Sequence, residues 1–158
     1  MSIFGDWYNE LGSKVTLNLD PKDSRQISGS YQTNVGDAKQ RTFPLTGRCN
    51  AASLSGQDQV IAWVVVWDPP DTGPDGQPVR KPSITAWAGQ YHVVQEIEFI
   101  TTTWLLTGMT DAADDWESTS VSMDIFFRVQ PTQAMLKLAK QFGKAAANVG
   151  PPMAAPSS

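Results

Sequence analysis

The sequence predicts an all-β protein: an eight-stranded antiparallel up-and-down β-barrel followed by a C-terminal helical extension. Three observations support this fold class. Short segments rich in Val, Ile, Thr and aromatic residues recur along the chain, turn-forming clusters separate most of them, and no connection between them reads as a helix. Strands without helical crossovers pair antiparallel, and closing eight of them into a barrel removes the exposed edges of an open sheet.

The expected strands follow one another through turns and loops. Turn residues predict hairpins at Asp20–Asp23 and Ser53–Gly56. The connection over residues 68–82 is dense in Pro and Gly and is therefore a loop, for which a plain surface loop is favoured over a lid beside the pocket mouth. The strands are expected at Asp6–Leu11, Lys14–Leu19, Gln26–Thr33, Phe43–Ala51, Gln59–Trp67, Ser83–His92, Glu96–Thr107 and Glu117–Val129.

Beyond Val129 the apolar residues recur at helical spacing. Pro131 can open a helix, and the Gly150-Pro151-Pro152 run ends it. We therefore divide the chain into a ligand-binding barrel over residues 1–130, an amphipathic helix over residues 131–149 and a flexible tail over residues 150–158. Because the helix is short and the protein is acidic, packing on the barrel or on a neighbouring subunit is favoured over membrane contact. The apolar stripe consists of Met135, Leu138, Ala139, Phe142 and Ala146.

Length and charge narrow the function classes. A chain of 158 residues fits one domain with a sizeable core, and its net charge of −4 argues against a nucleic-acid partner, which needs clustered Lys and Arg. No apolar run is long enough to span a membrane as a helix. The single Cys49 excludes an intrachain disulfide. The first ten residues lack the basic end and apolar stretch of a signal peptide.

Most of the six tryptophans lie on expected strands, several of them beside small polar residues. Successive side chains of a strand point to opposite faces, so residues at steps of two share one surface. Three such sets mix indoles or aliphatic groups with hydroxyls, a phenol or an amide. A face of this kind makes a poor hydrocarbon core and a good wall for a pocket that holds a compact ligand with apolar and hydrogen-bonding parts. The sets are Ser83, Thr85 and Trp87; Asn9, Leu11 and Ser13; and Tyr31, Thr33 and Val35.

Seven stretches carry a resemblance to a known family. In chain order they are GDWYNELGS, SGSYQTNVGDA, PLTGR, AWVVVW, SITAWAGQY, TTTWLLTG and DDWESTSVSMDIF. Their order and spacing resemble the avidin and streptavidin family of biotin-binding proteins, from about Gly5 to Val129. The resemblance implies tight, non-catalytic binding of biotin, with no cofactor other than biotin itself as the ligand. It also implies secretion of the protein and sequestration of the vitamin. Because the first residues do not resemble a signal peptide, a location inside the cell is the alternative.

The resemblance assigns a role to each candidate site residue. Asn9, Ser13 and Tyr31 match the donors to the ureido oxygen of biotin, while Asp124 and Thr33 match the acceptors from its two N–H groups. The remaining matches are Thr85 to the ring sulfur; Trp67, Trp87 and Trp104 to the aromatic walls; Leu11, Val35 and Leu106 to the apolar lining; and Ser83 with the backbone N–H of Asp37 to the tail carboxylate.

Two matched positions carry further expectations. Asp37 stands where streptavidin has a neutral Asn, and its charge is mildly repulsive toward a carboxylate-ended ligand. Trp116 matches a tryptophan that reaches from one subunit into a neighbour's pocket, which implies a homotetramer, with Val121 and Met123 in a second contact. Two other functions remain in competition: a lipocalin-like barrel for another small ligand, and an enzyme using Asp124 as a general base. No nucleophile–base pair or metal cluster supports the enzyme.

Overall fold

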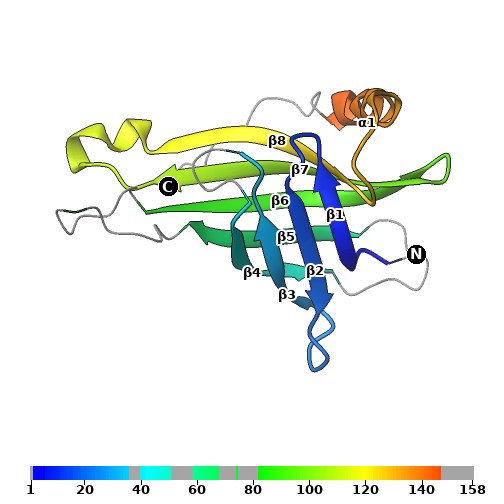
Figure 1. The fold of residues 1–158 in the computed structure, drawn as a ribbon, viewed down its shortest axis with the longest axis horizontal. Helices are drawn as coiled ribbons and strands as arrows, with labels where there is room; N and C mark the ends of the chain where they lie inside the picture. The colour runs from blue at the N-terminus through cyan, green and yellow to red at the C-terminus, as the bar shows by residue number, and fades with distance from the viewer. Residues whose placement is uncertain (1, 36–39, 51–58, 68–73, 75–81, 147–158) are drawn as a thin grey trace, which may run out of the picture.

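The computed structural model describes residues 2–35, 40–50, 59–67, 74 and 82–146. Within them eight antiparallel strands form a closed barrel in which each strand pairs with the next and β8 pairs back with β1 (Figure 1). This confirms the predicted fold class. The strands are β1 (Gly5–Asn9), β2 (Lys14–Leu19), β3 (Gln26–Gln32), β4 (Thr42–Cys49), β5 (Val60–Trp67), β6 (Ser83–Val94), β7 (Ile97–Gly108) and β8 (Thr119–Phe127).

The strand limits differ from the predicted ones where turn geometry intervenes. β1 ends at Asn9 rather than Leu11, because the chain turns at Gly12 with a left-handed φ of 83°. β6 and β7 extend to a two-residue turn at Gln95 and Glu96, which have φ values of 50° and 64°. Two consecutive residues with positive φ give the hairpin turn whose twist suits paired strands. The hairpin at Asp20–Asp23 is confirmed, and Ser53–Gly56 lies outside the described residues.

The start of the eighth strand was predicted wrongly. Residues Ala112–Glu117 form a short 3₁₀-helix, η1, and β8 begins only at Thr119. Asp111 precedes η1 in an extended conformation, and the Asp114 N–H donates to the Asp111 carbonyl at 2.9 Å. Asp side chains compete with ladder hydrogen bonds and favour turns, so the DAADDWE run leaves the sheet. Trp116 is therefore displayed on a helical turn and not on a strand.

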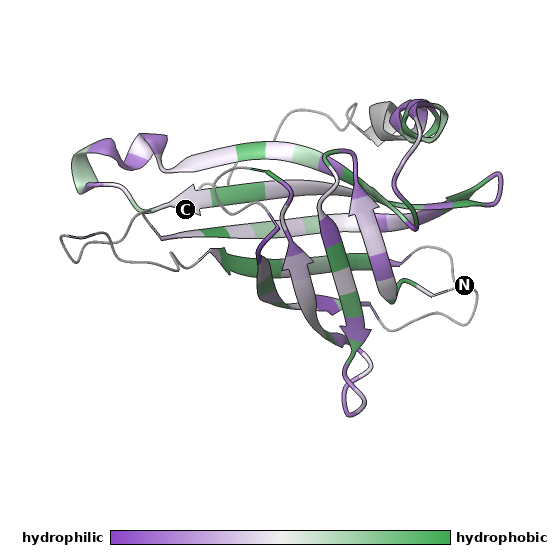
Figure 2. Ribbon diagram, viewed as in Figure 1, coloured by the Kyte–Doolittle hydropathy of each residue, from purple (hydrophilic) through white to green (hydrophobic). Residues whose placement is uncertain are grey.

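Inward side chains fill the barrel, and tryptophan dominates the filling. Trp7 and Trp63 are fully buried in the main core. β5 is apolar along nearly its whole length (Figure 2), with Ile61, Trp63 and Val65 pointing inward. Trp63 stacks on Trp87 with ring centroids 5.8 Å apart, so the core continues directly into the face that carries the candidate site.

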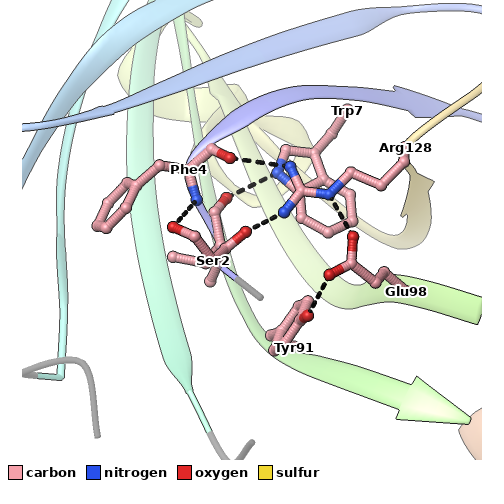
Figure 3. A network of polar contacts seen from close by, with 7 residues as sticks. Ser2, Phe4, Trp7, Tyr91, Glu98 and Arg128 are labelled. Atoms are coloured by element: carbon pink, nitrogen blue, oxygen red, sulfur yellow. Dashed lines mark hydrogen bonds and ion pairs between the residues drawn. The ribbon is translucent and has the colours of Figure 1, made fainter. Parts of the chain in front are cut away.

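One end of the barrel is closed by the N-terminal segment and a set of polar contacts, here called the Arg128 network (Figure 3). It consists of Ser2, Ile3, Phe4, Trp7, Tyr91, Glu98 and Arg128. The Arg128 guanidinium lies 3.7 Å from the centre of a Trp7 ring and pairs with Glu98 at 2.7 Å. It also donates to the backbone carbonyls of Ser2 and Phe4, the latter at 2.9 Å. These contacts fix the segment that precedes β1 across the barrel end.

The helix α1 (Gln133–Ala146) packs on the outside of its own barrel, against β7 and β8. Leu136 and Ala139 are buried there against a cluster formed by Phe99, Ile125 and Phe127. The helix begins at Gln133, because the Thr132 side chain caps it by accepting from the Met135 N–H at 3.3 Å. Pro131 therefore precedes the cap. Among the described helices, none is long and apolar enough to cross a membrane.

Candidate functional site

A cavity opens inside the barrel at the end away from the Arg128 network, with a volume of about 160 Å³. Its wall is built by residues from the end of β1, the β1–β2 turn, β3 and the segment after it, and strands β5 to β8. Each of them belongs to the set predicted from the sequence. The lining residues are Asn9, Leu11, Ser13, Tyr31, Thr33, Val35, Trp67, Thr85, Trp87, Trp104, Leu106 and Asp124.

Two predicted residues that the structure describes do not line this cavity. Ser83 lies half-buried at the start of β6, on the same face as Thr85 and Trp87. Trp116 lies on η1 with 77% of its surface exposed, away from the cavity of its own chain. Asp37 lies outside the described residues.

The aromatic walls are held by one another and by hydrogen bonds. The Tyr31 ring stacks on Trp87 at 5.0 Å between centroids, and Trp67 meets Trp87 edge-to-face at 6.2 Å. The Trp67 indole N–H donates to the Thr85 hydroxyl at 2.6 Å. Trp87 rests on the buried Trp63 behind it. Because each ring is fixed by another, the walls are preorganised for a flat ligand.

Three residues of the lining present hydrogen-bond donors. The Asn9 side-chain carbonyl accepts from the backbone N–H groups of Leu11 and Ser13, at 3.1 and 2.8 Å, so its NH₂ group is left to donate, and it does so to Asp124 with a second N–H remaining. The Ser13 oxygen accepts from the Asn34 N–H at 2.9 Å, which likewise leaves the hydroxyl proton for donation. Burial raises the pKa of Tyr31, as does nearby Asp124, so its phenol keeps its proton.

Two other residues of the lining, Asp124 and Thr33, present acceptors. Asp124 is 6% exposed, and its carboxylate accepts from the Trp87 indole N–H at 3.0 Å. Burial raises the pKa of Asp124, although hydrogen bonds from Trp87, Trp104 and Asn9 work in the opposite direction. The Thr33 hydroxyl donates to the Val35 carbonyl and accepts from the Val35 N–H, each at 3.2 Å. One lone pair on its oxygen is therefore left to accept a further hydrogen bond.

Two residues that support Asp124 were not predicted from the sequence. Thr102 lies opposite Asp124 in the β7–β8 register, and its buried hydroxyl donates to the Asp124 backbone carbonyl at 3.1 Å. Glu10 accepts from the Ile125 N–H at 3.2 Å, and burial raises its pKa. Thr102 could have been found from the register of β7 and β8, which pairs it with Asp124. Glu10 follows the last residue of β1, where strand alternation no longer indicates direction.

The arrangement suits binding of a small polar ring system. Donors, acceptors and indoles that line one cavity can hold a compact ligand that has both a polar edge and apolar faces. Within the described residues, no three His, Cys, Asp or Glu side chains are grouped to hold a metal ion. Fold and cavity together define a small-ligand-binding β-barrel.

Comparison with known proteins places this barrel in a family. A sequence model of the avidin family matches residues 1–129, and the chain is 29% identical to avidin of Gallus gallus over 134 residues. That alignment covers 82% of this chain and 79% of avidin. The chain belongs to the avidin family, a family of biotin-binding proteins that are not enzymes. The helix α1 lies beyond the matched residues.

Proposed function

We propose that this protein binds biotin tightly and non-covalently and sequesters it without chemical change. The observation that carries the proposal is that three donors, Asn9, Ser13 and Tyr31, line the same cavity as the acceptors Thr33 and Asp124. A ureido group has one oxygen that accepts and two N–H groups that donate. A buried polar group left without a partner costs about 1–3 kcal/mol, so this matched set favours a ureido ring over ligands that lack one.

The remaining lining residues suit the other parts of biotin. The bicyclic ring system lies between Trp67, Trp87 and Trp104 in this proposal, with its sulfur beside Thr85. The tail then passes Leu11, Val35 and Leu106 toward Ser83 and the backbone N–H of Asp37. The polar set Asn9, Ser13, Tyr31, Thr33 and Asp124 argues against a lipocalin-like barrel for another small ligand, because it supplies a partner for each polar atom of the ureido group.

Calorimetry with biotin and lipoic acid tests this function directly. Both ligands carry a five-carbon acid tail on a sulfur-containing ring, and only biotin has the ureido group. We expect saturable binding of biotin and displacement by biotin, but not by lipoic acid, of a dye that occupies biotin pockets. Absence of heat on adding biotin to the intact protein, or equal displacement by both acids, contradicts the proposal.

We further propose that the protein is a homotetramer in which Trp116 closes the cavity of a neighbouring subunit. Its indole is 77% exposed on the described chain, and a large aromatic buried over a ligand can contribute several kcal/mol to binding. The outer face of β8 adds exposed apolar side chains at Val121 and Met123. Two different two-fold contacts on one subunit give a closed tetramer.

Light scattering and the biotin off-rate test this assembly together. Trp116→Lys should loosen the assembly and speed biotin release, whereas Trp116→Phe should preserve more of both. A monomeric native protein, or an unchanged off-rate for Trp116→Lys, contradicts exchange of this residue between subunits.

The proposed setting is outside the cell, where removing biotin deprives competitors of the vitamin. Detection of the protein in the medium and not in the cell extract of its source supports this placement. Retention inside the cell contradicts it.

A further inference from the structure

Two of the proposed ureido partners stand at the seam that closes the barrel, where β1 pairs with β8. Asn9 is the last residue of β1, and Asp124 lies on β8. The last pair between the two strands is Asn9–Phe126, and residues 119–125 of β8 continue past the end of β1 (Figure 1). Next to Asp124, the backbone of β8 therefore lacks a strand partner from β1.

Glu10 occupies the next position of this seam with its side chain. The register of the seam would pair Glu10 with Ile125, but the chain turns there toward Gly12. The Glu10 carboxylate instead accepts from the Ile125 N–H at 3.2 Å. A side-chain oxygen thus takes the place of the backbone acceptor that a longer β1 would supply to the ladder.

This bond fixes one peptide group from its second side. The Ile125 N–H and the Asp124 carbonyl belong to the same peptide group, and the Thr102 hydroxyl donates to that carbonyl at 3.1 Å. The group is therefore held by Thr102 from β7 and by Glu10 from the end of β1. Because the Asp124 side chain leaves the backbone directly beside this group, the two bonds together fix where its carboxylate lies. Groups that bind a ligand have to be held within about 0.5 Å by such supporting bonds.

The charges around Glu10 connect it with the cavity and with α1. Burial is the main cause that raises its pKa, and the negative charge of Asp124 raises it further. Hydrogen bonds from its own N–H and from Ile125, together with the positive charge of Lys140 on α1, act in the opposite direction. Glu10 also raises the pKa of Tyr31, although less than burial and Asp124 do. Since Glu10 itself does not line the cavity, it acts on a ligand through these neighbours.

We propose that Glu10 is a positioning residue of the ligand site, which holds the Asp124 carboxylate in place for the ligand by replacing the missing strand contact at the barrel seam. This inference rests on the proposed function, in which Asp124 accepts from a ureido N–H group. A ligand held by Asp124 leaves more readily when that carboxylate can move, so loosening the seam should act on the rate of release. The role requires an oxygen that accepts a hydrogen bond, which a carboxylate or a carboxamide supplies and a thioether supplies only weakly.

Rates of biotin release test the role with two replacements of similar length. Glu10→Met removes the accepting oxygen and should speed release by about tenfold, as for loss of a hydrogen bond to a charged group. Glu10→Gln keeps an accepting oxygen and should recover most of the native rate. Glu96→Met, at an exposed glutamate in the β6–β7 turn, is the matched control and should leave the rate unchanged. If Glu10→Met does not fold, Glu10→Ala carries the same expectation.

The Asp124→Ala background distinguishes positioning from a general loss of stability. Because Glu10 acts through Asp124, Glu10→Met should change biotin release by less than about twofold once Asp124 is replaced. A tenfold effect in both backgrounds, or equal release rates for the Met and Gln variants, overturns the positioning role. Easier unfolding in urea with a native release rate also overturns it and leaves biotin binding intact. Failure of the native protein to bind biotin overturns the proposed function as well.

Discussion

A tryptophan, a tyrosine and a carboxylate meet at each of two places in this barrel. In the Arg128 network they are Trp7, Tyr91 and Glu98, and they surround a guanidinium (Figure 3). In the cavity they are Trp87, Tyr31 and Asp124, with no Lys or Arg among the lining residues that the structure describes. The same side-chain types thus occur once with a cation from the chain and once without one.

The two carboxyl groups respond differently to burial. Burial raises the pKa of both groups, but at Glu98 hydrogen bonds from Tyr91 and Arg128 outweigh it and the net pKa is lowered. At Asp124 the neutral donors Trp87, Trp104 and Asn9 do not outweigh burial, and the net pKa is raised. A carboxylate that is fully paired stabilises the fold. A carboxylate that is buried among neutral donors only gains further stabilisation when a ligand adds N–H groups.

The largest expected effect is on ligand binding at Asp124. Asp124→Ala should weaken biotin binding by roughly 2–5 kcal/mol, as for loss of a buried charged partner. It should not weaken the unliganded fold as Arg128 variants do, because burial of this carboxylate is unfavourable in the absence of ligand. Calorimetry gives the binding change, and urea unfolding gives the stability. A large loss of stability with normal affinity would reverse the roles assigned to the two regions.

The pH dependence follows from the same raised pKa. A carboxyl group whose folded pKa is raised contributes stability at pH below its ordinary pKa and loses that contribution as pH rises through the raised value. In the proposed function the ionised Asp124 accepts from a ureido N–H group, so we expect the affinity for biotin to fall as pH falls through the raised pKa. Asp124→Asn should remove this fall in biotin affinity at low pH. A native profile that is flat through the mildly acidic range contradicts the assignment.

The second effect is on stability at the Arg128 network. Arg128→Ala removes an ion pair, two backbone contacts and a cation–π contact, and should lower the free energy of unfolding by about 2–4 kcal/mol. Since the pKa of Glu98 is lowered, its contribution is present above its ordinary pKa and is lost as pH falls through the lowered value. Arg128→Lys should be intermediate, because it keeps the charge without the planar fork. Biotin affinity of the folded variants should be unchanged.

The sequence predicted the cavity better than the Arg128 network. The reason is that the residues of the network stand far from one another along the chain. Residues of one strand, such as Thr85 and Trp87, share a face by alternation alone. The partners of Arg128 stand at residues 2, 4 and 98, and no local pattern connects them. Glu10 was missed because it lies in a turn, where the backbone and not alternation sets direction. Trp116 was expected in a turn and lies on η1, a short helix that backbone hydrogen bonds close.

A third effect, smaller than the first two, concerns α1. Leu136→Ala should lower the free energy of unfolding by about 2 kcal/mol, because Leu136 is buried between the helix and the outer face of β7 and β8. Lys137→Ala on the exposed face of the same helix is the control. Deleting Pro131–Ser158 should likewise lower the melting temperature or alter assembly without abolishing biotin binding. Loss of binding in a folded truncation would show that the C-terminal segment forms part of the site.

The smallest effect should come from Thr85→Val, which changes one hydroxyl to a methyl group of similar size. The Trp67 indole loses its acceptor at 2.6 Å, while the Trp7 indole of the Arg128 network keeps its bond to the Ile3 carbonyl at 2.7 Å. A single hydrogen bond contributes about 0.5–1.5 kcal/mol, so biotin release should be several-fold faster. Unfolding in urea should change little, since Trp67 is only half-buried and can rotate its N–H toward water. Stopped-flow release of biotin, measured beside the unfolding curve, distinguishes the two. Equal changes in the rate of biotin release and in the free energy of unfolding would mean that Trp67 stabilises the fold as Trp7 does. The cavity and the Arg128 network would then not differ at this residue.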